Sequence, residues 1–195
     1  MYKTLILTFT GLLLLTGAVG VGDDFKDDFS KRPNLYGEKK GYAIWGSGAQ
    51  ILKAAGYDPE TGCQAPGSLK IDGSKMPQKG SNSALFVKSL PVEPGCKYNL
   101  MLKVLKKELT GDPMITGRII MIGEKNSRKV PMRQVRRDPQ SFEDGTWTRM
   151  LVAIEIPSQE KLAETPRVTI QFGVQNLKGG TVWFDDVEFF KEENQ

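Results

Sequence analysis

The chain has 195 residues, of which 39% are hydrophobic and 26% are charged, and its formal net charge is +4. This length suits one folded domain, and so small a positive charge does not by itself imply nucleic acid as a partner. The chain has no histidine, which excludes Ser-His and Cys-His catalysis and histidine-ligated metals. Its two cysteines are too few for a cysteine-rich zinc or iron–sulfur site, so composition argues against most enzyme classes.

The first twenty residues have the pattern of a secretory signal peptide. Lys3 precedes an apolar run over 5–15 that is too short to span a bilayer comfortably. Ala18 and Gly20 then occupy the minus-three and minus-one positions of a cleavage site. We therefore expect cleavage after residue 20 and one domain over 21–195 with no membrane span, secreted or periplasmic. An uncleaved anchor is the alternative.

The rest of the sequence consists of segments in which apolar and polar residues alternate, which is typical of β-strands. In the clearest segment, 97–106, Tyr98, Leu100, Leu102 and Val104 share one face. Further predicted strands are 42–45, 50–54, 68–71, 84–89, 117–123, 146–156, 167–174 and 181–190.

Turn-forming residues separate these strands, as at Asp72-Gly73, Gly111-Asp-Pro113, Asp144-Gly145 and Gly179-Gly180. The only helical pattern covers 158–164, after Pro157. About nine strands with almost no helix predict an all-β fold, an antiparallel β-sandwich of the jelly-roll type.

Cys63 and Cys96 form an even pair in a chain that we expect to be exported. Exported proteins commonly join such pairs, so the sequence predicts a disulfide between them. The alternative is two reduced thiols that pack as small apolar groups.

Three segments together resemble motifs of a known group of proteins. They are PGCKYNL at 94–100, DGTWT at 144–148 and TVWFDDVEF at 181–189. In this order and spacing they resemble the carbohydrate-binding modules of families 4, 9 and 22, which are galactose-binding-like jelly rolls. Asp28-Phe29 and the GSLKI segment at 67–71 match two more strands of these modules. The resemblance covers about 24–191 and implies glycan binding.

The resemblance also implies a structural calcium ion. In such modules the first aspartate of the closing strand often helps to hold calcium together with the N-terminal strand. The matching residues here are Asp185 and Asp28, while Ser30, a weaker ligand, stands where the family has a glutamate. A plain hydrogen-bonded Asp185 carboxylate is the alternative.

Sugars are bound by aromatic side chains that stack on the C–H face of the ring and by a few planar polar groups. Aromatic residues in glycine-rich or turn-like stretches and glutamines that alternate with an apolar stripe are candidates for these roles. The candidate ligand-binding residues are therefore Tyr42, Trp45, Tyr57, Gln171 and Gln175, with Asn99, Lys103 and Arg118 as further polar candidates. Core packing is the alternative for the aromatic residues, and Trp147 and Trp183 are expected in the core.

A basic stretch over 128–137 contains five cations and no acidic residue before Asp138. Pro131 cannot donate to a strand ladder, so the stretch is expected to be an edge strand or a loop. Such an edge can protect against aggregation, which we favour, and capture of an anionic polysaccharide is the alternative.

The sequence offers no pair of carboxylates suited to glycoside hydrolysis. Asp185 and Asp186 are adjacent in a predicted strand, so strict alternation would point them to opposite faces. We therefore expect a non-catalytic, exported module that binds polysaccharide or another glycan, and no enzyme. A structural or adhesive jelly roll without sugar affinity is the alternative, and an unrecognised hydrolase or lyase is a third possibility.

Overall fold

A computed structural model describes residues 24–35, 37, 41–47, 50–122, 132–137, 141–158 and 166–192, with the backbone alone for 132–137. The expected signal peptide over 1–20 lies outside these ranges, as does nearly all of the expected helix at 158–164. The elements in chain order are β1 (Phe25–Asp27), β2 (Ala43–Gly46), α1 (Ile51–Ala54), β3 (Ala55–Asp58), β4 (Ser68–Asp72), the 3-10 turn η1 (Gly73–Lys75), β5 (Ser83–Pro91), β6 (Lys97–Ile122), β7 (Met132–Arg137), β8 (Thr148–Glu155) and β9 (Arg167–Lys191).

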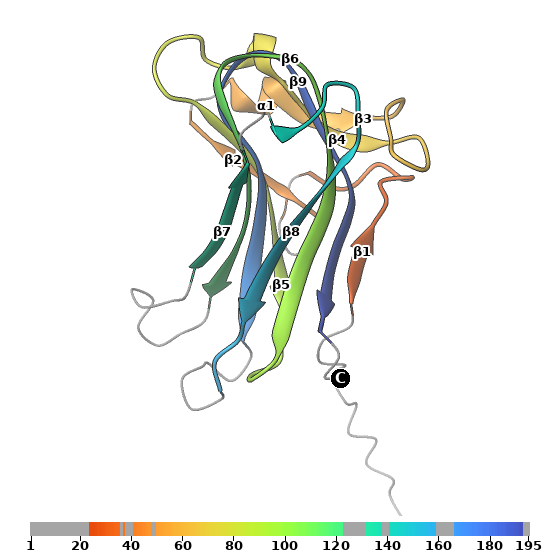
Figure 1. The fold of residues 1–195 in the computed structure, drawn as a ribbon, viewed down its shortest axis with the longest axis vertical. Coiled ribbons are helices and arrows are strands. Elements are labelled where there is room, and N and C mark those ends of the chain that lie inside the picture. Colours follow the sequence, from red (N-terminus) through yellow and green to blue (C-terminus); the bar gives the residue numbers. More distant parts are fainter. Residues whose placement is uncertain are drawn as a thin grey trace, which may run out of the picture.

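The two longest strands, β6 and β9, take part in both layers of the fold. They pair antiparallel along their whole length, from Tyr98 opposite Lys191 to Ile122 opposite Arg167. The register shifts between 107 and 114 of β6, where Glu108 and Gly111 adopt left-handed backbone angles. Bulges of this kind bend a strand pair, and Figure 1 shows the resulting arch at the top of the molecule.

The arch divides the strands into two antiparallel layers, which we call sheet 1 and sheet 2. Sheet 1 runs β2, β5, residues 167–175 of β9, residues 115–122 of β6, and β7. In sheet 2, residues 181–191 of β9 pair with β4 and β1 on one side and with 97–107 of β6 on the other; β3 and β8 complete it. The predicted antiparallel β-sandwich is confirmed.

One hydrophobic core fills the space between the sheets. The stripe predicted in 97–106 is buried, and so are the stripes of β8 and β9. The Phe172 ring of sheet 1 lies 5.8 Å from the Phe86 ring and 5.4 Å from the Phe184 ring of sheet 2. The sheets approach closely at Gly117, where a Cβ would lie 2.8 Å from Cε of Met150.

The structure differs from the sequence prediction at residues 50–54 and at the two turns expected in the arch. The expected strand at 50–54 is the short helix α1, whose Ile51 and Ala54 bury one side, and β3 follows it directly. The expected turns at 111–113 and 179–180 lie inside β6 and β9, because pairing continues through the arch.

The expected disulfide is wrong, because Cys63 and Cys96 are both free thiols. Sγ of Cys63 lies 3.1 Å from Nζ of Lys103, whereas Cys96 precedes β6, seven residues before Lys103. Seven strand residues span about 23 Å, while a disulfide requires Cα atoms within about 7 Å. A disulfide would require β4, which follows Cys63, to lie beside β6, which follows Cys96. The structure instead pairs β4 with β3 and β9.

Replacement of Phe172 tests the contact between the sheets. We expect Phe172→Ala to lower the free energy of unfolding by about 3–5 kcal/mol, because it leaves a cavity among aromatic rings from both layers. Chemical denaturation measures the change. Leu52→Ala, at an exposed position on α1, is the control and is expected to stay within about 0.5 kcal/mol of the parent. Equal effects in the two variants would contradict the described packing.

Candidate functional site

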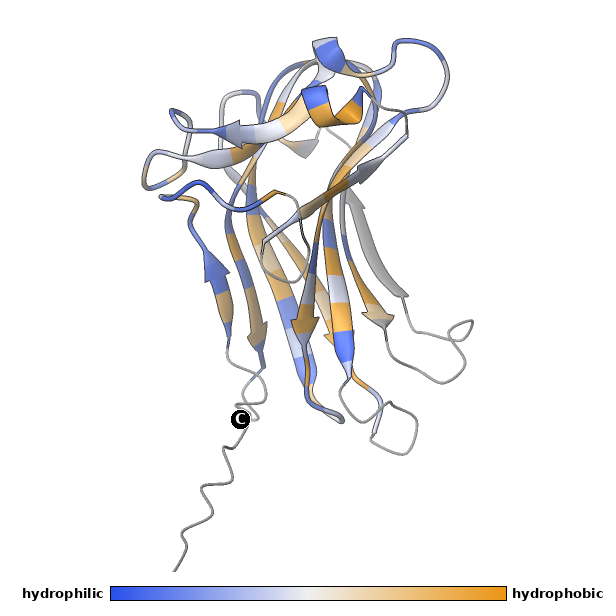
Figure 2. Ribbon diagram, turned by 180° about the vertical axis from the view of Figure 1, so that it is seen from behind, coloured by the Kyte–Doolittle hydropathy of each residue, from blue (hydrophilic) through white to orange (hydrophobic). Residues whose placement is uncertain are grey.

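The side of sheet 1 that faces away from the core carries the candidate site, and we call it the outer face. Phe86 and Phe172 point into the core, so their strand neighbours point to the other side of the sheet. Several of these neighbours, among them Val87 and Gln171, are also buried. Figure 2 shows hydrophobic and hydrophilic bands of colour along the strands. Residues opposite one another on neighbouring strands form rows across this face. One row is Trp45, Leu85, Gly173 and Thr116; the next is Ala43, Val87, Gln171 and Arg118; and a third is Ser89, Thr169 and Ile120. On the other side of the Trp45 row lie Ser83, Gln175 and Met114.

Trp45 provides an aromatic platform on this face. Among the described residues it is the one large aromatic side chain that is clearly exposed, at 49%. Its strand end is fixed, because Ser47 and Ser83 exchange backbone and side-chain hydrogen bonds and because Ile51 of α1 packs closely against Gly46. An indole held on a fixed strand suits stacking against a flat apolar surface.

Polar groups stand beside this platform. Gln171 and Gln175 lie on β9 on either side of Gly173, two strands from Trp45 or roughly 10 Å across the sheet. Gln171 is only 4% exposed, so its position is held by its surroundings. The buried hydroxyl of Thr116 has no hydrogen-bond partner among the described residues. An indole beside amide and guanidinium groups can bind a ligand rich in hydroxyl groups.

The structure corrects the expectation for Tyr42, which is fully buried. Its ring lies 5.7 Å from that of Phe29 and 5.8 Å from that of Phe172. The ammonium group of Lys88, which also lies in the core, is 5.2 Å from the Tyr42 ring centroid. Tyr42 therefore packs inside the sandwich and is closed to a glycan.

Tyr57 is also a packing residue. It lies in β3 of sheet 2 and not in the expected turn, its ring packs against the core, and its hydroxyl donates to the Phe29 carbonyl at 3.0 Å. Trp147 and Trp183, both expected in the core, are only partly buried. Of the predicted ligand residues, the structure therefore brings together only Trp45, Gln171 and Gln175.

Asp185 and Asp186 lie at a β-bulge in β9. The expectation that their side chains alternate strictly between the two faces of the strand is therefore wrong. Asp186 has a φ of 45°, and the register with β6 shifts between Met101 and Lys103. Asp185 accepts the Cys63 N–H at 2.6 Å, while the Asp186 carboxylate pairs with Lys103 at 3.0 Å. Because Lys103 also contacts the Cys63 thiol, both carboxylates lie beside the same loop residue.

The hydrogen bonds of these residues favour the alternative without a calcium ion. Asp185 uses its second oxygen to accept the Asp186 N–H at 2.7 Å, and Asp28 accepts both donors of Ser30. Calcium takes six to eight oxygen ligands, yet within the described ranges no three acidic or cysteine side chains converge on one point. Burial raises the pKa of the Asp185 carboxyl, and the N–H groups of Cys63 and Asp186 oppose this shift. The geometry matches the hydrogen-bonded alternative.

The loop that carries Cys63 is fixed at its start by Asp58. This carboxylate accepts hydrogen bonds from Nε1 of Trp183 at 2.8 Å, Nζ of Lys70 at 3.2 Å and the Glu60 N–H at 3.0 Å. Burial acts to raise the pKa of Asp58, but these donors together lower it to about 2. The indole N–H of Trp183 is thus used in a hydrogen bond within the protein.

The described part of the basic stretch, β7, pairs with β6 alone and so lies at an edge of sheet 1. This agrees with the expected edge strand, although residues 128–131 lie outside the described ranges. The register places Gln134 opposite Arg118 and Arg136 opposite Thr116.

Sequence reasoning missed two parts of this surface. Thr116 could have been found by extending the alternation from Ile119 back along β6, but the pairing of β6 with β9 is needed to place it beside Gln171. A group of lysines near α1 gave no periodic signal, because Lys53 lies on α1 whereas Lys75 and Lys79 lie in the segment 74–79.

No protein-family model matches the sequence, and no curated protein sequence matches it. Several solved structures are similar in fold. A candidate sugar-binding protein from Bacteroides thetaiotaomicron aligns over 84% of this chain and 96% of its own, with a TM-score of 0.59 and 15% identity. The tandem CBM22-1–CBM22-2 domain of Xyn10C from Paenibacillus barcinonensis aligns over 92% of this chain and 52% of its own, with a TM-score of 0.53 and 13% identity.

The module TmCBM61, solved with β-1,4-galactotriose, aligns over 83% of this chain and 100% of its own, with a TM-score of 0.50 and 16% identity. A cyclase from Fischerella sp. is also similar, with a TM-score of 0.51 and 12% identity over 85% of this chain. The chain thus has the β-sandwich fold of carbohydrate-binding modules, a fold that also carries an enzyme. None of the described helices is long and apolar enough to cross a membrane.

The lowered pKa of Asp58 predicts a loss of stability in acid. The carboxyl has a pKa of 3.8 as its ordinary value and about 2 in the folded protein, so its ionised form stabilises the fold. That stabilisation, about 2 kcal/mol, is complete well above pH 4 and is lost as the pH falls through about 2. Urea denaturation of the parent and of Asp58→Asn measures it. We expect the difference between the two proteins to shrink over this range, and a constant difference would contradict the role of the carboxylate.

The surroundings of Asp185 predict that calcium has no effect on stability. We expect the same melting temperature in calcium and in a chelator, because within the described ranges no group of three acidic or cysteine side chains forms around Asp185 to hold the ion. Asp185→Asn is expected to lower the melting temperature in both solutions equally, since it removes one acceptor at a buried site. A calcium-dependent rise in the parent that Asp185→Asn abolishes would show that calcium binds here.

Proposed function

We propose that this chain is a non-catalytic carbohydrate-binding module that binds a glycan on the outer face of sheet 1 and acts outside the cell. The observation that carries the proposal is the placement of Trp45, exposed on a fixed strand, on the same face as Gln171 and Gln175. The shared fold with carbohydrate-binding modules supports it.

The arrangement supplies both kinds of contact that a sugar needs. The indole of Trp45 offers an apolar face to the C–H surface of a pyranose ring. The amide of the partly exposed Gln175 can donate to one sugar hydroxyl and accept from its neighbour.

The residue types of the outer face support a binding role over a hydrolytic one. Hydrolysis of a glycosidic bond requires two carboxyl groups that flank it. The described rows of the outer face contain neither aspartate nor glutamate. Elsewhere, the adjacent pair Asp185 and Asp186 is engaged by Cys63 and Lys103.

Action outside the cell rests on the sequence of the first twenty residues, which has the charge, apolar run and small residues of a signal peptide. The proposal is tested by expression of the full chain in a bacterial host that exports proteins. An exported protein whose N-terminus is residue 21 supports it, while an uncleaved chain that stays with the membrane contradicts it.

Glycan binding is tested on a glycan array and then by titration calorimetry with the glycan that is retained. We expect Trp45→Ala to weaken binding by about tenfold or more, because an exposed aromatic anchor is removed. Gln175→Leu, which removes the amide of the more exposed glutamine and keeps the volume, is expected to weaken binding as well.

Leu151→Ala is the matched control for Trp45→Ala, because Leu151 is also a large exposed apolar residue but lies on β8 of sheet 2. It is expected to leave binding unchanged, and thermal melts check that all variants are folded. Loss of affinity in both variants, or in neither, contradicts the proposed site. A folded parent that retains no glycan contradicts the proposed function and favours a structural or adhesive role.

A further inference from the structure

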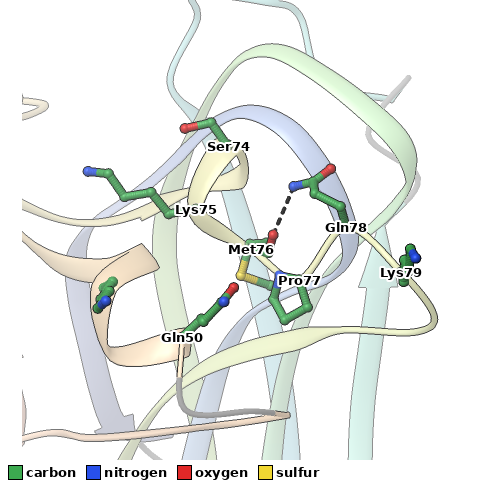
Figure 3. Close-up of a pocket in the computed structure, with 8 residues that line it drawn as sticks. Gln50, Ser74, Lys75, Met76, Pro77, Gln78 and Lys79 are labelled. Atoms are coloured by element: carbon green, nitrogen blue, oxygen red, sulfur yellow. Dashed lines mark hydrogen bonds between the residues drawn. The ribbon is translucent and has the colours of Figure 1, made fainter.

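A hollow of about 990 Å³ lies between α1 and the segment 74–79. Figure 3 shows Gln50 on one side of it and Ser74, Lys75 and Gln78 on the other. Its lining includes three lysines, Lys53, Lys75 and Lys79, and, among the residues that the structure describes, no aspartate or glutamate. The described wall of the hollow therefore brings together positive charge and amide groups.

The wall of the hollow is fixed by hydrogen bonds to the backbone of segment 76–80. The buried Asn82 donates to the carbonyls of Pro77 and Leu177, and Nζ of Lys178 donates to those of Pro77 and Gly80. Gln78 donates to the Met76 carbonyl at 2.8 Å, as Figure 3 shows. A wall held in this way keeps its shape without a ligand, which lowers the entropic cost of binding.

Little of this positive charge is neutralised by the protein. Lys75 pairs with Asp72 at 3.1 Å in an exposed contact, which is a weak interaction in water. Lys53 and Lys79 form no ion pair with any residue in the described ranges. At least two ammonium groups are thus available to a negatively charged ligand.

The hollow lies next to the outer face. Gly46, which follows Trp45, packs against Ile51 of α1, and Gln50 of the hollow immediately precedes Ile51. The outer face contains Arg118 and, in its described rows, no acidic residue, although the whole chain has 23 Asp and Glu residues against 27 Lys and Arg. Two adjoining surfaces of the same sign are complementary to an anionic ligand.

We infer that the glycan is an acidic polysaccharide, and that the hollow between α1 and η1 binds one of its carboxylate or sulfate groups while Trp45 stacks against a sugar ring. This inference rests on the proposed function. The lysines act as mobile point charges that suit either anion, and the amides of Gln50 and Gln78 can donate to its oxygens.

The test compares polysaccharides that share a backbone and differ in charge. Homogalacturonan is used with its carboxylates free and with them methyl-esterified, and κ-carrageenan is used as such and after desulfation. We expect the parent to bind one of the charged forms about tenfold more tightly than its neutral counterpart. The affinity for that form is expected to fall as sodium chloride is raised, because salt screens exposed charges. The pair that shows the difference identifies the anionic group.

The variant Lys53→Gln, Lys75→Gln, Lys79→Gln removes the charge of the hollow. We expect it to lose about tenfold in affinity for the charged form and little for the neutral form, since three exposed contacts are lost. The matched control is Lys26→Gln, Lys31→Gln, Lys97→Gln, which removes the same charge from exposed positions that do not line the hollow. The control is expected to retain the affinity of the parent.

The outcomes separate this inference from the proposed function. Equal affinity for charged and neutral forms, or an equal loss in both triple variants, overturns the inference. If a neutral glycan then still binds in a manner that depends on Trp45, the proposed function stands. If the folded parent binds none of these polysaccharides and no glycan of the array, both are overturned.

Discussion

The antiparallel pairing of β6 with β9 is the constraint on which the rest of the structure depends. It runs through both sheets and through the arch between them, so the position of each layer follows from one strand pair. The remaining strands add to its two sides: β5, β4 and β1 pair with β9, and β8 and β7 pair with β6. The arch requires left-handed backbone at four positions, of which Gly111 and Gly180 are glycines.

A second constraint is the bulge at Asp185 and Asp186. Before it Val182 and Phe184 face the core, and after it Val187 and Phe189 do. The first pair has even residue numbers and the second has odd ones, so a strand without a bulge would turn one pair away from the core. An aspartate tolerates the left-handed backbone, and Lys103 and the Cys63 N–H stabilise the two carboxylates. The bulge at these two aspartates therefore keeps the apolar residues on both sides of it directed inward.

The two outer surfaces of the sandwich differ in chemistry because their charges are arranged differently. On sheet 2, cations and acids pair directly, as Lys70 does with Asp58 and Lys103 does with Asp186. On sheet 1, the described rows hold glutamines and arginine without acids. The same contrast separates two tryptophans, since Trp183 is held by Asp58 whereas Trp45 remains exposed. A binding surface is thus distinguished from a structural one by what its polar groups already contact.

The sequence by itself determined the β-sandwich, because alternation in β6, β8 and β9 records which side of each strand is buried. It also placed Trp45, Gln171 and Gln175 among the ligand candidates. Only the tertiary structure decided that Tyr42 is core, that Cys63 lies far from Cys96, and that Thr116 stands beside Gln171. Alternation is a local property of one strand, whereas burial of a ring, distance between thiols and neighbours across a sheet depend on which strands pair, and that is set by contacts between residues far apart in the chain.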